Sequence, residues 1–163
     1  MSKTQENHLK AFAGESMATR KYLAFAQKAE EEGYPEIAEL FRKRAEQESA
    51  HALEHARRLG IIKTTLENIE AAITGETDEY SEMYPRFAGE AREEGDEDAA
   101  KFFEALAEIE EYHAREFFKI LQKLEGKQLK WRCAVCGNVH TGDEPPERCP
   151  VCGAAKEYSY LTN

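Results

Sequence analysis

Two short segments of the chain pair a glutamate with a histidine three residues later. Glu48 precedes His51, and Glu110 precedes His113. Residues three apart lie on one face of an α-helix, so each pair can offer a carboxylate and an imidazole to one metal ion. A Glu-Glu-Gly segment precedes the glutamate of both pairs, and the interval between them is the same in the two copies. The sequence therefore predicts a duplicated helical hairpin whose two copies each carry a metal-binding segment.

Four stretches with the helical period of apolar residues should position these pairs. They cover residues 5–32, 35–59, 78–94 and 98–124. Short turns containing glycine join the first stretch to the second and the third to the fourth, which predicts two antiparallel hairpins. Pro85 should kink the third helix or shift its phase. Residues 60–77, with an amphipathic piece that ends at Gly75, are long enough to cross the length of a bundle, as the ferritin-like crossover does.

Glutamates interrupt the apolar face of three of these helices. Glu15, Glu48 and Glu110 all fall among residues that should face the core. Burying a carboxylate costs several kcal/mol unless a cation or hydrogen bonds compensate. Two metal ions, held by one glutamate from each of two helices and a Glu-x-x-His pair from each of the others, would supply that compensation.

The position of the metal site along the helix axes can be used to choose among the acids of the third helix. Glu110 follows the glycine of its turn, and its counterpart should precede that glycine by a similar interval, near position 80. Glu79 and Glu82 lie on either side of that position. Glu90 would be displaced by about ten residues, or ~15 Å along the helix. We therefore predict Glu79 and Glu82 as ligands and leave Glu90 and Glu93 to solvent.

A plainer interpretation of each residue has to be weighed against the metal site. A single Glu-x-x-His pair is usually a surface polar pair, and Glu15 alone could face water. The Glu-x-x-His pair occurs twice, at equal distances from matching turns, and each of the other two helices has an acid at a similar position along its axis. This combination favours the dimetal interpretation. The other histidines, which are interpreted as taking no part in metal binding, are His8, His55 and His140.

The four cysteines form two Cys-x-x-Cys-Gly segments near the C-terminus. They are Cys133, Cys136, Cys149 and Cys152. Four thiolates make a tetrahedral metal site, and the glycine after each pair lets the backbone turn its amides toward the sulfurs. Zinc ribbons use the same spacing, so the tail alone leaves open a structural zinc or an electron-transferring iron. The small core of this module is predicted to consist of Trp131, Tyr158 and Tyr160.

Charge and composition limit the possible partners. The 163 residues carry a net charge of −10, and residues 128–163 hold equal numbers of acids and bases. Nucleic acids and anionic membranes require basic patches, so we expect neither as a partner. No run reaches the ~20 apolar residues of a membrane span, and the polar first ten residues lack a secretory signal, so we expect a cytoplasmic protein. We predict a helical domain at 1–127 and a cysteine module at 128–163.

Together these segments resemble the rubrerythrin family over nearly the whole chain. The matching stretches are residues 11–16, 48–51, 79–85, 110–113, 131–137 and 149–153. The resemblance implies a mainly α protein, with a ferritin-like four-helix bundle that binds two iron ions. A small rubredoxin-like domain with one iron in the four-cysteine site would follow, with zinc as its substitute.

The resemblance also implies a role for each ligand. Glu48 and Glu110 would bridge the two irons, with Glu15 and Glu79 as terminal ligands. His113 would hold one iron permanently, while the other would move between His51 and Glu82 as its oxidation state changes. Tyr22 would hydrogen-bond a ligand glutamate, or would simply be a half-buried core tyrosine. The catalytic residues implied are Glu82, His51 and Tyr22.

The activity implied is that of a peroxidase that reduces hydrogen peroxide to water. A rubredoxin or an NAD(P)H-dependent reductase would supply electrons through the cysteine-held iron, and the protein would be a homodimer or a larger assembly. The connection from Leu59 to Glu79 is shorter than in many members, which leaves open whether hairpins are exchanged between subunits. Two other functions also stay open: oxygen-driven iron oxidation, which would not need the cysteine module, and a non-enzymatic zinc-ribbon scaffold.

Overall fold

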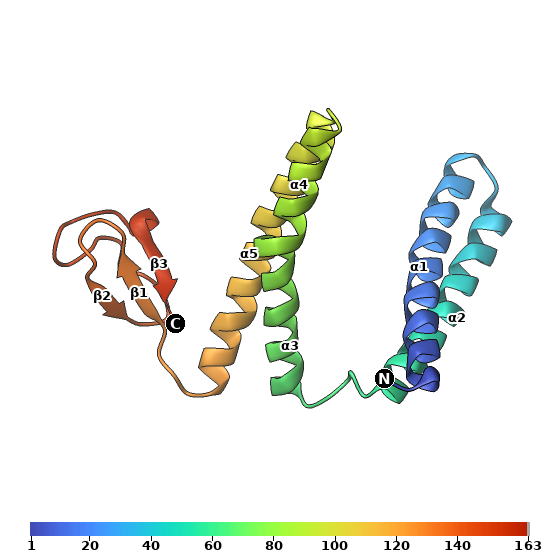
Figure 1. Cartoon of the computed structure of the whole chain (residues 1–163), viewed down its shortest axis with the longest axis horizontal. Helices are drawn as coiled ribbons and strands as arrows, with labels where there is room; N and C mark the ends of the chain where they lie inside the picture. The colour runs from blue at the N-terminus through green and yellow to red at the C-terminus, as the bar shows by residue number, and fades with distance from the viewer. Residues whose placement is uncertain (163) are drawn as a thin grey trace. The chain divides into compact units, whose positions relative to one another are not determined.

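The chain forms two compact units, each containing a helical hairpin (Figure 1). The structure is a computed structural model that describes residues 1–162. The first unit is Met1–Lys63, and the second begins at Thr64. Helices dominate both units, and a small sheet follows the last helix, as predicted for a mainly α fold. Among the described residues, no helix is long and apolar enough to span a membrane.

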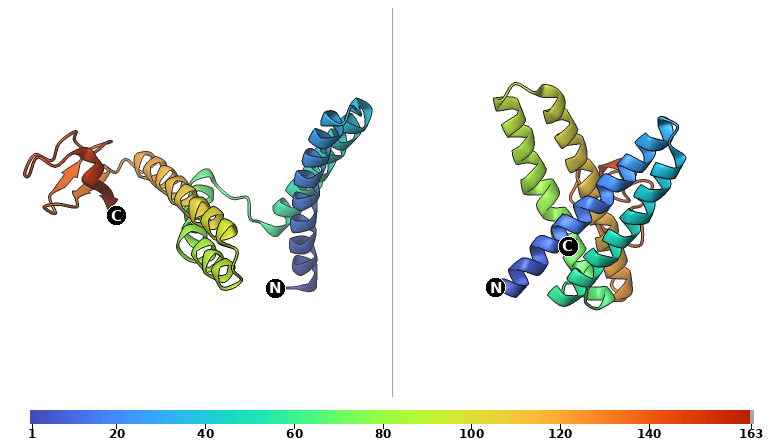
Figure 2. Two further views of the ribbon diagram at one scale, coloured as in Figure 1. Left: turned by 90° about the horizontal axis from the view of Figure 1, so that it is seen from above. Right: turned by 90° about the vertical axis from the view of Figure 1, so that its right-hand side faces the viewer.

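The first unit is an antiparallel pair of long helices, α1 (Lys3–Glu31) and α2 (Pro35–Leu59) (Figure 2). The Ser2 side chain accepts a hydrogen bond from the Gln5 amide, and the Gln5 side chain bonds back to Ser2, which caps the start of α1. Gly33 adopts a positive φ of 82° in the turn, a conformation that costs glycine little. The predicted first hairpin is confirmed.

The second unit contains a longer first rod than the sequence predicted. Helix α3 (Thr65–Asp78), the π-helix η1 (Glu79–Met83) and α4 (Tyr84–Glu93) follow one another without interruption and pack against α5 (Glu97–Leu124). A Thr64 capping box starts this rod. The predicted start near residue 78 is therefore wrong, because Gly75 does not end the helix and residues 65–78 belong to the rod.

The π-helix changes the phase of this rod. The Tyr84 amide donates to the Glu79 carbonyl five residues earlier, which gives this turn one residue more than an α-helical turn. Pro85 follows at once and has no amide hydrogen to complete an α-helical bond. The phase shift predicted at Pro85 is confirmed.

The connector between the two hairpins is consequently short. Only residues 60–64 separate α2 from α3, and Gly60 uses a left-handed conformation to end α2. The sequence had assigned residues 60–77 to a crossover long enough to span a bundle. That prediction is wrong, because most of those residues are helical.

Alanines fill the contact between the two helices of each hairpin. The first cluster contains Ala26, Ala29 and Ala38, and the second contains Ala88, Ala91 and Ala100. Every member of the first cluster has its counterpart in the second at one constant offset along the chain. Among the described residues no large side chain is fully buried, and many large apolar side chains on both hairpins stay exposed.

The cysteine module contains a three-stranded antiparallel sheet. Its strands are β1 (Lys130–Cys133), β2 (Val139–Thr141) and β3 (Ser159–Thr162), in the order β2-β1-β3. Trp131 is buried and its indole Nε1 donates to the Gly142 carbonyl at 2.9 Å, so its predicted core role is confirmed. Tyr158 and Tyr160 are exposed, and their predicted burial is wrong.

Candidate metal centres

Three groups of side chains in residues 1–162 could each hold a metal ion. In each group, one ligand atom per residue lies within 4.8 Å of the others. One group belongs to the first hairpin, one to the second hairpin and one to the cysteine module. They comprise Glu15, Glu48 and His51; Glu76, Glu110 and His113; and Cys133, Cys136, Cys149 and Cys152.

The first group brings together the predicted ligands of the first hairpin. Glu15 comes from α1, whereas Glu48 and His51 come from one face of α2. The His51 Nδ1 atom lies 3.1 Å from Glu48 Oε2. A hydrogen bond between the two carboxyl groups raises the pKa of Glu15 and lowers the pKa of Glu48, which is the behaviour of two acids that share one proton. A cation would relieve the repulsion that makes this sharing necessary.

The second group repeats that arrangement on the other hairpin. The His113 Nδ1 atom lies 2.6 Å from Glu110 Oε2 and 3.5 Å from Glu76 Oε2. Glu76 comes from α3, and both partners come from α5. Burial raises the pKa of Glu76, and a hydrogen bond and charge repulsion from Glu110 add to that effect. Each hairpin therefore carries one carboxylate and one Glu-x-x-His pair at the same place.

Glu76 takes the position for which the sequence favoured Glu79. Glu79 is half-buried, and its charge acts on Glu76 and Tyr84, but the structure does not bring it into the group. Glu82 is exposed and also lies outside the group. Two features explain the difference: the acid of the first helix lies farther from the turn than the Glu-x-x-His pair does, and the π-helix adds one residue. Glu76 lies one position farther from the glycine of its turn than Glu15 does from the corresponding glycine.

A repeated segment in the sequence could have identified Glu76. Residues 11–16 read Ala-Phe-Ala-Gly-Glu-Ser, and residues 72–77 read Ala-Ile-Thr-Gly-Glu-Thr. The offset between these two copies is one position smaller than the offset between the two Glu-x-x-His pairs. One inserted residue between the segments accounts for the difference, and η1 supplies it.

A tyrosine lies beside an aromatic pair in each hairpin. Tyr22 contacts Phe41 with ring centroids 5.9 Å apart, and its counterpart Tyr84 stacks on Phe103 at 6.2 Å. Burial, followed by the negative charge of Glu110, raises the pKa of Tyr84. Sequence reasoning missed Tyr84, although its offset from Tyr22 equals the offset between the two Glu-x-x-His pairs. The hydrogen bond from Tyr22 to a ligand glutamate stays a prediction.

Two histidines that the sequence left without a role form a pair within the first hairpin. The Nδ1 atoms of His8 and His55 lie 2.8 Å apart, so the N–H of one ring donates a hydrogen bond to the other ring. Both side chains are half-buried. The corresponding positions of the second hairpin hold Ile69 and Phe117. The histidine pair is thus a polar contact that the second hairpin replaces with apolar residues.

The cysteine module gathers its four sulfurs in a set suitable for one metal. The Sγ atoms of Cys133 and Cys152 lie 3.7 Å apart, and those of Cys136 and Cys149 lie 3.5 Å apart. Backbone amides of residues 152 and 151 lower the pKa of Cys149 to about 6, which favours its thiolate. The glycines that follow the two cysteine pairs both have positive φ, as expected for turns that direct amides at the sulfurs.

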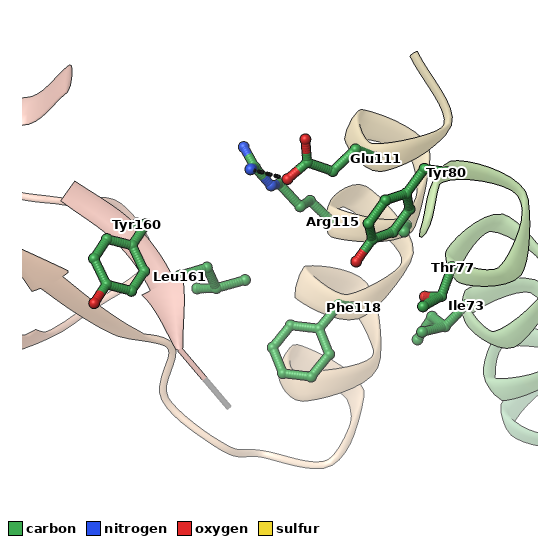
Figure 3. A pocket seen from close by; sticks show the side chains of 9 residues that line it. Ile73, Thr77, Tyr80, Glu111, Arg115, Phe118, Tyr160 and Leu161 are labelled. Carbon is green, nitrogen blue, oxygen red and sulfur yellow. Dashed lines mark hydrogen bonds and ion pairs between the residues drawn. The ribbon is translucent and has the colours of Figure 1, made fainter. Parts of the chain in front are cut away.

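A separate pocket of about 500 Å³ lies in the second unit, lined by residues of α3, η1, α5 and β3 (Figure 3). The aromatic rings of Tyr80 and Phe118 point into it, and an ion pair joins Arg115 to Glu111 on α5. None of its lining residues belongs to the three metal-ligand groups.

The donor atoms fit iron at all three groups. Carboxylate and imidazole suit iron in a dimetal centre, and four thiolates suit a single iron or zinc. Family models match the chain in two places: Rubrerythrin over residues 6–121, and Rubrerythrin, rubredoxin-like domain, over residues 131–158. The chain belongs to the rubrerythrin family.

Two rubrerythrins with known sequences agree with this assignment. The rubrerythrin of Nitratidesulfovibrio vulgaris is 39% identical, over 98% of this chain and 94% of its own length. The rubrerythrin of Porphyromonas gingivalis is 37% identical, over 96% of this chain and 88% of its own length. A solved structure of nigerythrin in a mixed-valence state is 30% identical, covers 99% of this chain and 88% of its own, and has a TM-score of 0.39.

Membership in the rubrerythrin family confirms several predictions. The chain is mainly α with a rubredoxin-like module, as in the ferritin-like rubrerythrin family, and the cofactors are two iron ions at the carboxylate groups and one at the four-cysteine site. The protein is an oxidoreductase whose function is redox chemistry at these iron sites. The ligand assignments, the substrate and the domain boundary after residue 127 stay predictions.

Proposed function

We propose that the protein reduces hydrogen peroxide to water at its carboxylate site. The observation that supports this choice most directly is the presence of a four-cysteine site in the same chain as the two Glu-x-x-His groups. Oxygen-driven iron oxidation requires no such module, whereas a reductase needs electrons returned to its centre after every turnover. An iron ion held by the four cysteines would provide a one-electron relay for that purpose.

The two hairpin groups would hold the iron pair between them. Glu48 and Glu110 would bridge the irons, and Glu15 and Glu76 would be the terminal ligands. This assignment moves the terminal role from Glu79 to Glu76, because Glu76 is the acid that lies with Glu110. The histidine of each Glu-x-x-His pair would complete the coordination of one iron.

Glu79 is the acid best placed to change its interactions during turnover. It is half-buried in the π-helix, and its charge acts on Glu76 and Tyr84. Glu82, which the resemblance had suggested for this role, is exposed and outside the group. An extra carboxylate beside the site would stabilise the more positive, oxidised state of the centre. We therefore assign to Glu79 the switching role expected of Glu82.

The reaction consumes two electrons and two protons for each peroxide, and yields two water molecules. Iron bound at the site would supply the two electrons and would stabilise the charge on the departing oxygen. The ligand carboxylates would fix the positions of the metals and balance their charge, whereas the neutral histidines would add no charge. The four cysteines would hold an iron ion, through which electrons from a rubredoxin or an NAD(P)H-dependent reductase would return singly.

Anaerobic stopped-flow spectroscopy of the reduced protein tests this function. Hydrogen peroxide should oxidise the centre at least ten times faster than an equal concentration of oxygen does. Glu79→Ala should keep its iron and react with peroxide at least tenfold more slowly, whereas Glu82→Ala should react like the wild type. Faster oxidation by oxygen would favour the iron-oxidation function, and a redox-silent protein that binds only zinc would favour the scaffold.

A further inference from the structure

Two histidines meet at the open end of the first hairpin. His8 lies in the second turn of α1, and His55 lies near the end of α2. Their Nδ1 atoms are 2.8 Å apart, and their ring planes are tilted by 52°. The turn that contains Gly33 closes the other end of this hairpin. The histidine pair is therefore a polar contact that joins the two helices where no turn joins them.

Small residues of α2 allow the two rings to meet. Ala52 and Ala56 precede and follow His55 on α2, and they are 7% and 3% exposed. Both are buried where α2 packs on α1, and side chains of this size let the two helices approach closely. The imidazoles of His8 and His55 consequently lie half-buried between the helices.

The second hairpin indicates that the fold does not require a polar pair at this place. Ile69 and Phe117 occupy the corresponding positions, where they form an apolar pair. Burying a polar ring costs free energy that one hydrogen bond only partly offsets, and each imidazole has a second nitrogen to satisfy. Packing alone therefore gives no reason for histidine at both positions.

The geometry of the pair suits two ligands of one metal ion. Imidazole nitrogens bind such an ion at about 2.1 Å, which places two of them about 3.0 Å apart at a right angle and about 3.4 Å apart at the tetrahedral angle. The observed separation of the Nδ1 atoms is 2.8 Å, so the rings need to move by only a few tenths of an ångström. The ring that donates the hydrogen bond transfers its hydrogen to Nε2, and both Nδ1 lone pairs then face the ion.

Nearby acids favour a cation at the pair without binding it. The charge of His55 acts on the Glu15 carboxyl. Glu15 follows His8 by one heptad, and Glu48 precedes His55 by one heptad, so the pair lies about 10 Å along the helix axes from these acids. At that distance a carboxylate attracts a cation but cannot coordinate it. The pair is therefore a separate place from the first metal group.

Two imidazole ligands also select the kind of metal. Imidazole suits zinc, copper and nickel ions, and the affinity of such ligands rises from iron through nickel to copper. Ferrous iron stands low in this order, so it should prefer the carboxylate groups to a pair of histidines. Two protein ligands leave the remaining coordination positions to water.

We propose that His8 and His55 bind one divalent ion of the late first transition series, separate from the iron pair. The ion links α1 to α2 at the open end of the first hairpin. This site revises the interpretation of both histidines drawn from the sequence. It goes beyond the proposed function and does not depend on peroxide turnover.

Nickel binding to the iron-loaded protein, expressed without a histidine tag, tests this site. Equilibrium dialysis against nickel sulfate, followed by metal analysis, should show about one nickel ion per chain in the wild type. His8→Asn keeps a hydrogen-bonding group near the place of Nδ1 but removes the imidazole. Its nickel affinity should fall by about tenfold or more, because the second ligand of a chelate binds at a high effective concentration. His55→Asn should have the same effect, and His140→Ala, which removes a histidine outside the pair, should bind nickel like the wild type.

Three results would overturn the site. The first is a wild type that binds no nickel. The second is unchanged affinity in His8→Asn, which is the result expected if His51 and His55 of α2 chelate the ion by themselves. The third is loss of iron in step with the gain of nickel, measured in the same samples, which would indicate exchange at the iron groups.

Thermal unfolding provides a second measurement of the link between α1 and α2. An ion that binds only the folded pair stabilises the folded protein, so the unfolding midpoint of the wild type should rise with nickel concentration. The double variant His8→Ile with His55→Phe copies the second hairpin and should show no such rise. Equal rises in the two proteins would contradict the site. A wild type that binds nickel at the pair but does not reduce peroxide would remove the proposed activity and leave this site in place.

Discussion

The two hairpins repeat one arrangement of contacts and ligands, and three features distinguish them near the metal groups. Both use the same alanine contacts, the same tyrosine beside an aromatic pair, and the same Glu-x-x-His pair, all at one constant offset along the chain. The second hairpin alone contains a π-helix, and within it a half-buried glutamate, Glu79, beside the metal group. The first hairpin alone has the His8 and His55 pair. The duplication supplies two equivalent groups of carboxylates and histidine, and these differences make the surroundings of the two groups chemically unequal.

The largest expected effect comes from removing the acid that each hairpin contributes from its first helix. Glu76→Ala should lose the paired iron and reduce peroxide turnover by more than about 100-fold, since loss of outer-sphere partners alone costs 10- to 100-fold. Glu15→Ala should have the same effect, because it is the counterpart. Iron analysis with peroxide-dependent turnover provides the measurement, and full iron content in Glu76→Ala would show that the hairpins are not equivalent.

The next effect follows from removing the extra residue of the π-helix. Deleting Ser81 should convert η1 to α-helix and rotate Glu76 by about 100° relative to Tyr84. The paired iron should fall to less than about one tenth of the wild-type content. Ser81→Ala keeps the chain length and should retain its iron. The cysteine-held iron reports folding in both variants, and a deletion variant with normal paired iron would contradict the role given to η1.

A smaller effect is expected from enlarging the alanine contacts. Ala38 and Ala100 occupy equivalent positions and are both fully buried. Replacing either with Leu should destabilise the protein by about 1–3 kcal/mol, because a well-packed contact has no room for the added atoms. Urea unfolding measures this change. Equal losses at the two positions would support the repeat, and a loss at only one would show that the hairpins pack differently.

The smallest effect on stability is expected from changing the His8 and His55 pair, which the second hairpin replaces with apolar residues. The double variant His8→Ile with His55→Phe copies the residues of the second hairpin and should change the free energy of unfolding by less than about 1 kcal/mol, since both partners of the hydrogen bond are removed together. His8→Ala should cost more than the double variant, about 1 kcal/mol, because it leaves the half-buried His55 without its partner. A large loss in the double variant would reveal a further role for the pair.

Much of the fold and of the site follows from the sequence, because local signals specify them directly. Periodicity placed three of the helices correctly, and spacing pointed to the Glu-x-x-His pairs, Glu15 and the four cysteines, which the structure gathers into groups that could hold metal. Gly75 was misjudged as a helix end, because glycine weakens a helix without forbidding it when the rod packs along α5.

The sequence did not identify Glu76 as the acid of the third helix that lies with Glu110, and the reason is geometric. The level argument assumed equal distances on both sides of the turn, yet in the first hairpin Glu15 already lay farther from the turn glycine than Glu48 does. An inserted residue cannot be seen in a count that assumes regular helix, and the π-helix forms because Pro85 removes an amide that a regular helix would use. Comparison of the repeated segments around Glu15 and Glu76 would have revealed the insertion.

Counting the metals in wild-type and variant protein tests the central claim most directly. After growth with added iron, the wild type should hold three irons per chain, Glu76→Ala should hold one, and a Cys149→Ser variant should hold two. Dithionite should bleach the visible spectrum of the wild type, and hydrogen peroxide should restore it. A wild type with a single metal, or a Glu76→Ala variant that still holds three irons, would contradict the assignment of the two hairpin groups as halves of one dimetal site.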